Sequence, residues 1–313
     1  MSQPASFAFA AAGIMLLVAT GLACTCFRGW PTRLHVEANK MARNELPSLA
    51  VQRLVGAGIR LGATVGCRIE DPFRSCFGAS GDLELGTPGK QPQLLLIGDS
   101  HAWNLQYGLA MLLQERQLAG YAMTRPNTVM FHVHAEPAGH VLEWLARQPD
   151  VTGVVLASRW MDYAPGGSNP VQPPEAWDLQ LEEFAKRLQA MRRTLFVLAD
   201  IPGYDYAPSD IAARMKIIPP RQLEPGWSDH AQPAETYDRM QGAINRVLED
   251  ICRKTGAVFV PAHLALRKGE RYISFDEQEG CCVPLYGDAN HLTHAGSLLT
   301  ARFFAPYLLP EAP

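Results

Sequence analysis

Three residues in two distant segments have the types and spacing needed to activate a hydroxyl group for attack. Ser100 follows an apolar run, and Asp288 and His291 lie three positions apart much later in the chain. In a loop entering a helix, this spacing lets the carboxylate accept from one imidazole nitrogen while the other nitrogen faces a serine. The pattern therefore predicts a nucleophile, a base and a group that orients the base. Taken alone, each motif is also compatible with ordinary helix capping and a surface histidine.

The residues around Ser100 predict a local structure that exposes its hydroxyl. Residues 94–98 form an apolar run that ends at a glycine, which is typical of a strand buried on both faces. After the serine, leucines recur at helical spacing, at Leu105, Leu109 and Leu112. Unpaired backbone N–H groups and the dipole of such a helix would favour an anion forming beside its first residue.

The two motifs together resemble those of a known family. Gly98-Asp99-Ser100-His101, followed much later by Asp288-x-x-His291-Leu-Thr, is similar to the SGNH (GDSL-type) hydrolase superfamily. More narrowly, it resembles the SGNH domain fused to or associated with membrane acyltransferase family three, which O-acetylates bacterial surface glycans. The resemblance covers about residues 65–308 and implies that Ser100, His291 and Asp288 form a catalytic triad.

Apolar runs alternating with helical patterns predict an α/β fold with a parallel sheet. The expected arrangement has three layers, α/β/α, as in SGNH and flavodoxin-like proteins. Besides residues 94–98, the expected strands are 120–124, 151–157, 195–199 and 257–260. Besides the helix after Ser100, the expected helices are 137–147, 177–191, 237–251 and 295–304. The active site should then lie at the carboxyl ends of the strands.

The donors for an oxyanion differ from those of ordinary SGNH esterases. The Gly-x-Asn-Asp block expected after the strand at 151–157 is absent. Because losing one oxyanion donor costs about 3 kcal/mol of transition-state stabilisation, another group should replace it. The candidates are the backbone N–H of Ser100, the side chain of Arg159 and, as a weaker choice, Asn127. Arg159 is equally compatible with a structural ion pair.

Three further residues are candidates for lining the site. Asp99 is interpreted as an acceptor that stabilises the turn, with catalytic acid as the alternative. His101 either lines the site or simply begins the helix. Trp160, like Trp103, is compatible with either the core or a substrate contact.

Composition excludes some classes of function. The 313 residues are 47% hydrophobic with a net charge of -3, which suits one medium-sized α/β domain with additional segments and gives no electrostatic case for nucleic acid. His132 and His134 are two apart, but no third ligand is evident. Since there is also no Cys-x-x-Cys, no metal site is predicted.

Residues 7–27 contain no charged residue and are long enough to cross about 30 Å of hydrocarbon. They predict a transmembrane anchor within residues 1–30. A cleaved signal peptide is the alternative, although residues 1–6 lack Lys and Arg. Basic residues after the helix would favour a cytosolic domain. The family resemblance implies instead a single-pass protein of the bacterial inner membrane with its catalytic domain in the periplasm.

The remaining segments are assigned by composition and cysteine content. Residues 31–90 are predicted to form a periplasmic linker and disulfide-bearing extension, with a connecting helix at 34–60 and a loop at 80–92, and residues 91–313 the catalytic domain. An oxidising compartment would suit a disulfide between Cys67 and Cys76 and another from Cys252 to Cys281 or Cys282. Reduced thiols in a cytosolic enzyme are the alternative.

Residues 201–233 are rich in proline and too long for an ordinary connection. They predict a flap over the substrate, in which Tyr204, Tyr206 and Trp227 could stack on sugar rings. A surface excursion pinned by these aromatic residues is the alternative.

The expected function is acyl transfer, with acetyl as the group, to a hydroxyl of a cell-surface or secreted polysaccharide. A membrane acyltransferase would be the donor and partner, and no diffusible cofactor is required. The alternatives are a carbohydrate O-acetyl esterase and a non-catalytic glycan-binding domain of an acylation complex.

Overall fold

The computed structural model describes residues 83–309, except residues 126, 164–175, 207, 209–230 and 279–280. Within these residues, six strands form one sheet: β1 (Leu83–Gly86), β2 (Pro92–Gly98), β3 (Ala119–Thr124), β4 (Gly153–Ala157), β5 (Thr194–Leu198) and β7 (Val258–Val260). Their order is β1-β3-β2-β4-β5-β7. All neighbours pair in parallel except β1, which lies antiparallel to β3 at the edge.

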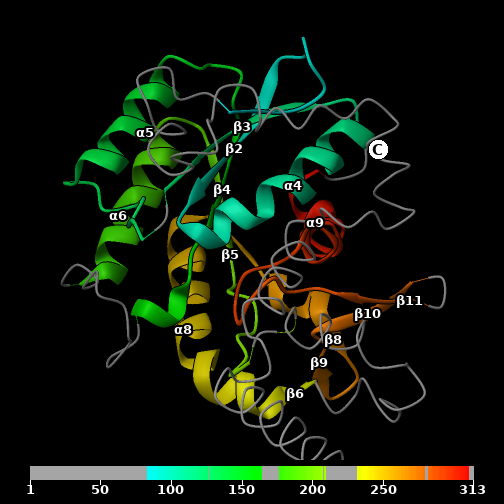
Figure 1. The fold of residues 1–313 in the computed structure, drawn as a ribbon. Coiled ribbons are helices and arrows are strands. Elements are labelled where there is room, and N and C mark those ends of the chain that lie inside the picture. Colours follow the sequence, from blue (N-terminus) through cyan, green and yellow to red (C-terminus); the bar gives the residue numbers. More distant parts are fainter. Residues whose placement is uncertain are drawn as a thin grey trace, which may run out of the picture.

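Helices cover both faces of this sheet (Figure 1). The helices are α4 (Ser100–Glu115), α5 (Glu136–Ala146), α6 (Trp177–Ala190), α8 (Ala234–Thr255) and α9 (His294–Leu308), with short 3-10 turns η2 (Trp160–Tyr163) and η5 (Ala262–Leu266). The apolar residues of α4 and α9 pack in one core, and those of α5 and α6 in another. The α/β fold and the largely parallel sheet predicted from the sequence are confirmed.

The central strand β2 shows why an uninterrupted apolar run was needed. Leu94 and Leu96 belong to the core under α4 and α9, whereas Leu95 and Ile97 belong to the core on the opposite face. All four side chains are at most 3% exposed. Because successive side chains of a strand point to opposite faces, a strand between two helical layers must be apolar at every position.

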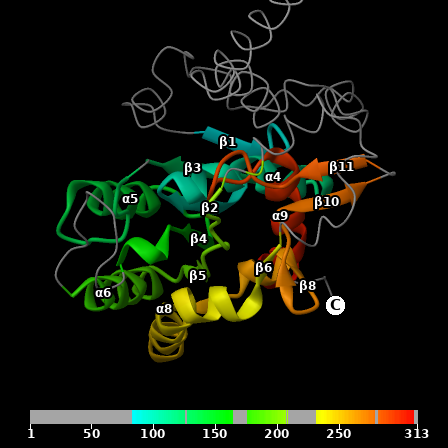
Figure 2. The same cartoon turned by 60° about the horizontal axis from the view of Figure 1, so that its bottom comes forward.

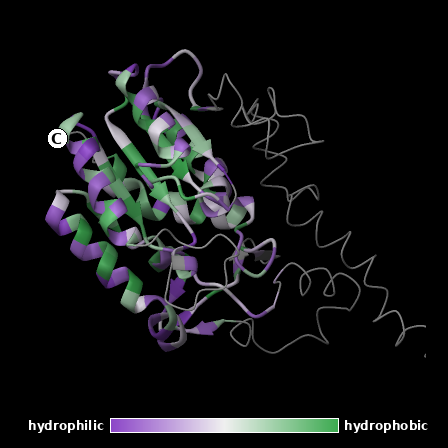
Figure 3. Cartoon of the chain, turned by 90° about the vertical axis from the view of Figure 1, so that its left-hand side faces the viewer, coloured by the Kyte–Doolittle hydropathy of each residue, from purple (hydrophilic) through white to green (hydrophobic). Residues whose placement is uncertain are grey.

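Hydrophobic and hydrophilic residues alternate along the helices, as Figure 3 shows. In α8, Ile244, Leu248 and Ile251 are buried against the sheet. The helical spacing also predicts Met240 and Val247 on this buried face, but they are 45% and 36% exposed. Both residues lie at the border of the apolar stripe, where neighbouring elements cover a side chain only in part.

Small antiparallel pieces lie outside the main sheet, beside α9 (Figure 2). They are β6 (Gln232–Pro233), β8 (Arg267–Lys268), β9 (Arg271–Tyr272), β10 (Phe275–Gln278) and β11 (Cys281–Pro284). No pattern in the sequence predicts them, because strands of two to four residues are too short to show a period. The expected loop at residues 80–92 likewise contains the edge strand β1.

Only the ends of the predicted flap fall within the described residues. Tyr204, expected to stack on a sugar, is 9% exposed and donates its hydroxyl hydrogen to the Tyr272 carbonyl at 3.1 Å. Tyr206 shares a 3.0 Å hydrogen bond with Ser274. Tyr204 is therefore a core residue, contrary to the sugar-stacking prediction, and Trp227 lies outside the described residues.

The predicted membrane anchor, the linker and the Cys67–Cys76 pair all lie outside the described residues. Across the described part of the chain, no helix has both the length and the apolar character of a membrane span. The predicted disulfide of Cys252 is wrong, since Cys252 is a free thiol that is 3% exposed. Its side chain faces the core between α8 and the sheet, and the neighbouring apolar residues enclose it.

Candidate active site

A tight turn between β2 and α4 places Ser100 at the first position of the helix. Gly98 has φ of +144°, and a Cβ there would lie 1.7 Å from the carbonyl oxygen of Ala157. Only glycine can occupy this position, because β4 passes against the backbone. Asp99 caps the helix by accepting from the backbone N–H of His101 at 2.8 Å. The serine hydroxyl is thereby held at the carboxyl edge of the sheet, as predicted.

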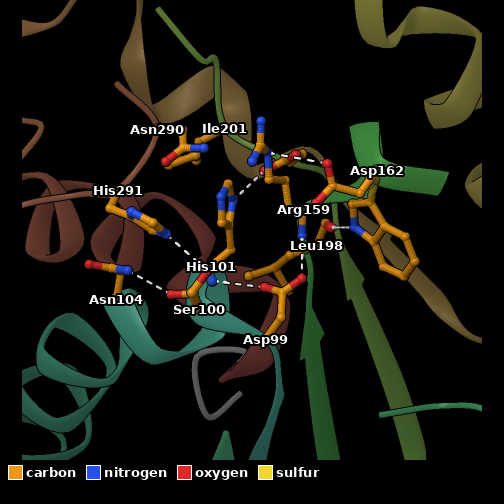
Figure 4. A network of polar contacts seen from close by, with 12 residues as sticks. Asp99, Ser100, His101, Asn104, Arg159, Asp162, Leu198, Ile201, Asn290 and His291 are labelled. Atoms are coloured by element: carbon orange, nitrogen blue, oxygen red, sulfur yellow. Dashed lines mark hydrogen bonds and ion pairs between the residues drawn. The ribbon is translucent and has the colours of Figure 1, made fainter. Parts of the chain in front are cut away.

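The structure brings the three predicted triad residues together, and Figure 4 shows His291 facing Ser100. Nε2 of His291 lies 2.9 Å from Oγ of Ser100. Nδ1 of the same ring lies 2.7 Å from Oδ2 of Asp288. The other carboxylate oxygen of Asp288 accepts from the backbone N–H groups of Asn290 and His291 at 2.9 and 2.8 Å. These bonds form a continuous chain from carboxylate to imidazole to hydroxyl.

The loop that carries Asp288 and His291 is closed by backbone bonds at its base. The Gly287 N–H donates to the His291 carbonyl at 2.8 Å. Thr293 then caps α9, since its hydroxyl oxygen accepts from Gly296 at 3.2 Å and its hydroxyl hydrogen is donated to the Pro284 carbonyl at 2.8 Å. The loop is therefore anchored on the helix that packs beside α4.

The helices α4 and α9 approach closely enough to share a hydrogen bond. The backbone N–H of Gly108 donates to Oγ of Ser297 at 2.9 Å, and a Cβ at Gly108 would lie 2.2 Å from the Ser297 carbonyl oxygen. This close packing fixes the start of α9 relative to the start of α4. The distance between His291 and Ser100 is thus set by two packed helices.

The electrostatics of Asp288 suit a carboxylate that orients an imidazole. Burial raises the pKa of Asp288, but the hydrogen bond from His291, the charge of that ring when it is protonated, and two backbone N–H groups lower it to about 2. The group is therefore ionised at neutral pH and accepts the Nδ1–H of His291. With Nδ1 protonated, Nε2 carries the lone pair that can take the Ser100 proton.

The side chains predicted to stabilise an oxyanion lie in different surroundings. Arg159 directs its backbone N–H to Asp99 at 2.8 Å, and its half-exposed side chain lies 3.6 Å from Asp162. Both groups lie close to the start of α4 (Figure 4). Asn127 follows β3 with φ of +54°, and no hydrogen bond among the described residues joins it to the triad.

Of the two alternatives for Trp160, core residue and substrate contact, the substrate contact is wrong. Its side chain is fully buried in the core under α5 and α6, and its indole N–H donates to the Leu198 carbonyl at 2.7 Å. Trp103, left open between core and site, is 39% exposed on α4, one turn beyond the nucleophile.

Asp99 behaves as the turn-stabilising acceptor expected of it. It accepts two backbone N–H groups, from His101 and Arg159, and burial raises its pKa. His101 lies in the first turn of α4, directly after Ser100, and its side chain does not open onto solvent. It is 5% exposed, and its Nδ1 lies 2.7 Å from Oδ1 of Asp200.

Two polar residues beside Ser100 were missed. Asp200 follows β5, so its position at the carboxyl end of a predicted strand was a usable signal. Asn104 donates its side-chain N–H to the Ser100 carbonyl at 2.6 Å, which the four-residue spacing within one helix allows. Asn104 therefore bonds to Ser100 and Asp200 to the next residue, His101, and neither belongs to the predicted motifs.

Three further histidines, His132, His134 and His294, lie beside other aromatic rings. The rings of His132 and His134 are 6.3 Å apart, and among the described residues no cluster of His, Cys, Asp and Glu could hold a metal ion. His294 stacks on Tyr107 with ring centroids 4.0 Å apart. Burial lowers the pKa of His294 to about 4, so the ring packs as a neutral group.

Solved structures with similar folds include acyl transferases and esterases. The periplasmic domain of a lipopolysaccharide acetyltransferase from Salmonella ser. Paratyphi A has a TM-score of 0.55 and 16% identity, covering 71% of this chain and 84% of that one. TesA has a TM-score of 0.42 and 15% identity, over 70% and 98% of the two chains. A variant of Axe2, an acetyl xylan esterase from Geobacillus stearothermophilus, has a TM-score of 0.41 and 13% identity, over 73% and 98%.

Sequence comparison identifies the family directly. No curated protein sequence matches the chain. The family model described as the SGNH domain fused to AT3 domains matches residues 66–306, which is most of the chain and includes both motifs, around Ser100 and around His291. The chain therefore belongs to the family of SGNH domains that are fused to AT3 domains.

Proposed function

We propose that this protein transfers an acyl group, acetyl in the simplest case, to a hydroxyl of a cell-surface or secreted polysaccharide. The observation that carries the proposal is the hydrogen-bonded chain from Asp288 through His291 to Ser100, at the N-terminus of α4. This is the arrangement that a serine hydroxyl needs to become a nucleophile at neutral pH.

In the first half of the reaction, Ser100 Oγ attacks the carbonyl carbon of a donor ester while Nε2 of His291 takes the hydroxyl proton. The tetrahedral intermediate then collapses to an acyl-serine, and the protonated His291 gives that proton to the departing oxygen. In the second half, His291 takes the proton of an acceptor hydroxyl, which attacks the acyl-serine, and then returns it to Ser100. Asp288 stabilises the imidazolium in both halves.

The developing oxyanion would be stabilised by the backbone N–H of Ser100 and the positive end of the α4 dipole. These groups begin the helix, where backbone donors have no intrahelical partner. The Arg159 side chain, at the same edge of the sheet, is our candidate for the donor that the absent Asn supplies elsewhere.

The family supports a proposal for the acyl donor and for the compartment. Because the family joins this domain to AT3 domains, we propose a membrane acyltransferase as the partner that supplies the acyl group. The similar Salmonella domain is periplasmic, and we propose the same location here, with residues 7–27 as the anchor in the inner membrane.

A carbohydrate O-acetyl esterase with the same triad is the second candidate. The side chains of Asp288 and His291 are 54% and 32% exposed, so water can reach the base from the solvent side. An acyl-serine that water attacks would give hydrolysis by the same sequence of proton transfers.

One experiment separates these functions. The purified full chain and its Ser100→Ala variant are incubated with an activated acetyl ester, with and without candidate oligosaccharides, and Ser100 is followed by intact mass. We expect acetyl to appear on Ser100 and then on a sugar, and neither event in Ser100→Ala. Release to water at the same rate with or without sugar would favour the esterase. If a fluorophosphonate failed to label Ser100 while glycan still bound, the domain would be a non-catalytic binder.

A further inference from the structure

A second histidine–carboxylate pair lies buried directly behind the nucleophile. Nδ1 of His101 lies 2.7 Å from Oδ1 of Asp200, and the two side chains are 5% and 2% exposed. His101 is the residue after Ser100, and Asp200 follows β5, so the pair joins the start of α4 to the edge of the sheet. In Figure 4 the His101 imidazole lies between His291 and the residues at the strand ends.

A contribution to folding stability does not explain why this pair is buried beside Ser100. A buried ion pair gives little net stabilisation, because desolvation offsets the attraction, and apolar residues of similar volume usually serve as well. In addition, Nε2 of His101 is buried without a hydrogen-bond partner among the described residues. Leaving a buried polar atom unpaired costs about 1–3 kcal/mol. A histidine retained at this cost beside the nucleophile suggests a role in the chemistry.

The ring of His101 contacts the base of the triad. The ring centroids of His101 and His291 are 5.4 Å apart, with an interplanar angle of 66°, an edge-to-face arrangement. The Ser100 hydroxyl approaches His291 from one direction and Asp288 from another. His101 therefore packs against the His291 imidazole and can hold its orientation while His291 exchanges protons.

Asp200 holds His101 in place and is itself held by α8. The carbonyl of Asp200 accepts from the Tyr237 hydroxyl at 2.7 Å, and the next carbonyl, of Ile201, accepts from Gln241 at 3.4 Å. The same segment then reaches the triad loop, since the Tyr204 N–H donates to the Ala289 carbonyl at 2.7 Å. One short segment thus fixes both His101 and the loop that carries His291.

Burial and the charged neighbours of His101 shift its pKa in opposite directions. Burial lowers the pKa of His101, but the negative charge of Asp200 and its hydrogen bond outweigh this and raise the pKa. Asp99 adds to the increase and Arg159 opposes it.

We propose that His101, held by Asp200, is a positioning residue that orients the His291 imidazole for its proton transfers with Ser100. The inference rests on the function proposed above. It adds two residues to the site, His101 and Asp200, which act through His291 and do not touch the substrate.

The test compares Asp200→Asn, His101→Gln and the double variant with the unmodified full chain. Asp200→Asn keeps the shape of the side chain and removes its charge. We expect kcat for an activated acetyl ester, per folded molecule, to fall about a hundredfold in each single variant, because a small misplacement of a catalytic group costs this much. KM should stay unchanged, and the double variant should lose no more than either single one.

Leu188→Ala is the control for a loss of stability alone. Leu188 is fully buried in α6, in the core on the face of the sheet opposite α4. It should lower the unfolding temperature and leave kcat per folded molecule unchanged. Unchanged kcat in folded Asp200→Asn and His101→Gln would overturn the inference while leaving the proposed function intact. Failure of both variants to fold would assign the pair to stability and also overturn it. An unreactive Ser100 in the unmodified chain would instead defeat the proposed function itself.

Discussion

At the scale of single residues, the bond between Asp288 and Nδ1 of His291 decides which ring nitrogen faces Ser100. Replacing Asp288 by Asn keeps the size but offers an amide N–H as readily as a carbonyl to Nδ1. The wrong tautomer then becomes accessible and Nε2 loses its lone pair. In a triad of this type the change lowers kcat by about 10⁴-fold.

We therefore expect Asp288→Asn to lose about 10⁴-fold in kcat for an activated ester, with little change in KM. Steady-state kinetics of the purified chain would measure this, with Asp178→Asn in the first turn of α6 as the control. A loss of tenfold or less would mean that Asp288 only caps the loop through Asn290 and His291.

Asp288 also makes stability depend on pH in a defined window. Its pKa is about 2 in the folded chain, below the ordinary value of 3.8. The stabilisation is therefore fully present above pH 3.8 and is lost as the pH falls through 2. The difference in unfolding temperature between the unmodified chain and Asp288→Asn should be largest above pH 4 and should shrink toward zero near pH 2. Thermal unfolding at a series of pH values measures it, and a difference independent of pH would contradict the assignment.

The three residues that the structure brings together could be singled out from sequence, because each lies at the end of a strand or before a helix. Ser100 comes after a glycine that ends an apolar run, and Asp288 and His291 precede a helix. The pairing of His101 with Asp200 could not be predicted, since both are polar residues whose side-chain directions depend on how α4 packs on the sheet. For the same reason Trp160 could not be separated from a substrate contact until its burial was known.

At the scale of elements, the turn from β2 to α4 depends on the absence of a side chain at Gly98. A methyl group there would meet the Ala157 carbonyl oxygen at 1.7 Å and Cβ of Ala102 at 2.8 Å, and φ of +144° is rarely adopted by other residues. Since backbone cannot give way as a side chain can, β4 or the start of α4 must move.

Gly98→Ala should therefore lower the free energy of unfolding by about 3 kcal/mol or more and displace Ser100. Gly139→Ala is the control, because nothing lies within 4 Å of its added Cβ in α5. The control should stabilise the protein by about 0.5–1 kcal/mol, as alanine does within a helix. Denaturant unfolding measures both, and equal stabilities of the two variants would contradict the packing described.

Elements with a long or continuous pattern were predicted, and short ones were not. Each of the strands β2, β4 and β5 contains a continuous apolar run, because helices cover both faces of the sheet. The strand β6 forms only by pairing with β9 much later in the chain, whereas β8 and β9 pair with each other across a tight turn. Strands of two residues are too short to show a period in the sequence.

At the scale of the whole molecule, the reactivity of the Cys252 thiol indicates whether the core is folded. It lies among the apolar residues between α8 and the sheet, and burial raises the pKa of its thiol to about 12. The thiolate is the reactive form, so the native protein should protect Cys252 almost completely from alkylation.

We expect alkylation of Cys252 to require unfolding of the core. The rate of modification, followed by peptide mapping, should rise with denaturant in parallel with the loss of folded protein. Rapid modification under native conditions would contradict the packing of α8 against the sheet.

The topology accounts for the location of the site. The parallel strands β2, β4 and β5 end at the same edge of the sheet, where Asp99 accepts from the backbone N–H of Arg159 and His101 pairs with Asp200. The alternation of strands and helices was sufficient to predict this edge. The missing information concerned side-chain partners across the edge, which depend on the packing of several elements at once.

The bond between His291 and Ser100 joins residues 191 positions apart in the chain. The strand, turn and helix that hold Ser100 are local, whereas its base arrives only when α9 docks on α4. Contacts so distant in sequence form late, because the intervening chain must first lose its freedom. A refolding molecule should therefore bury Trp160 and the strands around β2 before its serine becomes reactive. If Ser100 is the nucleophile proposed above, its hydroxyl gains a base only when nearly the whole domain has assembled, and its reactivity would then measure completed folding.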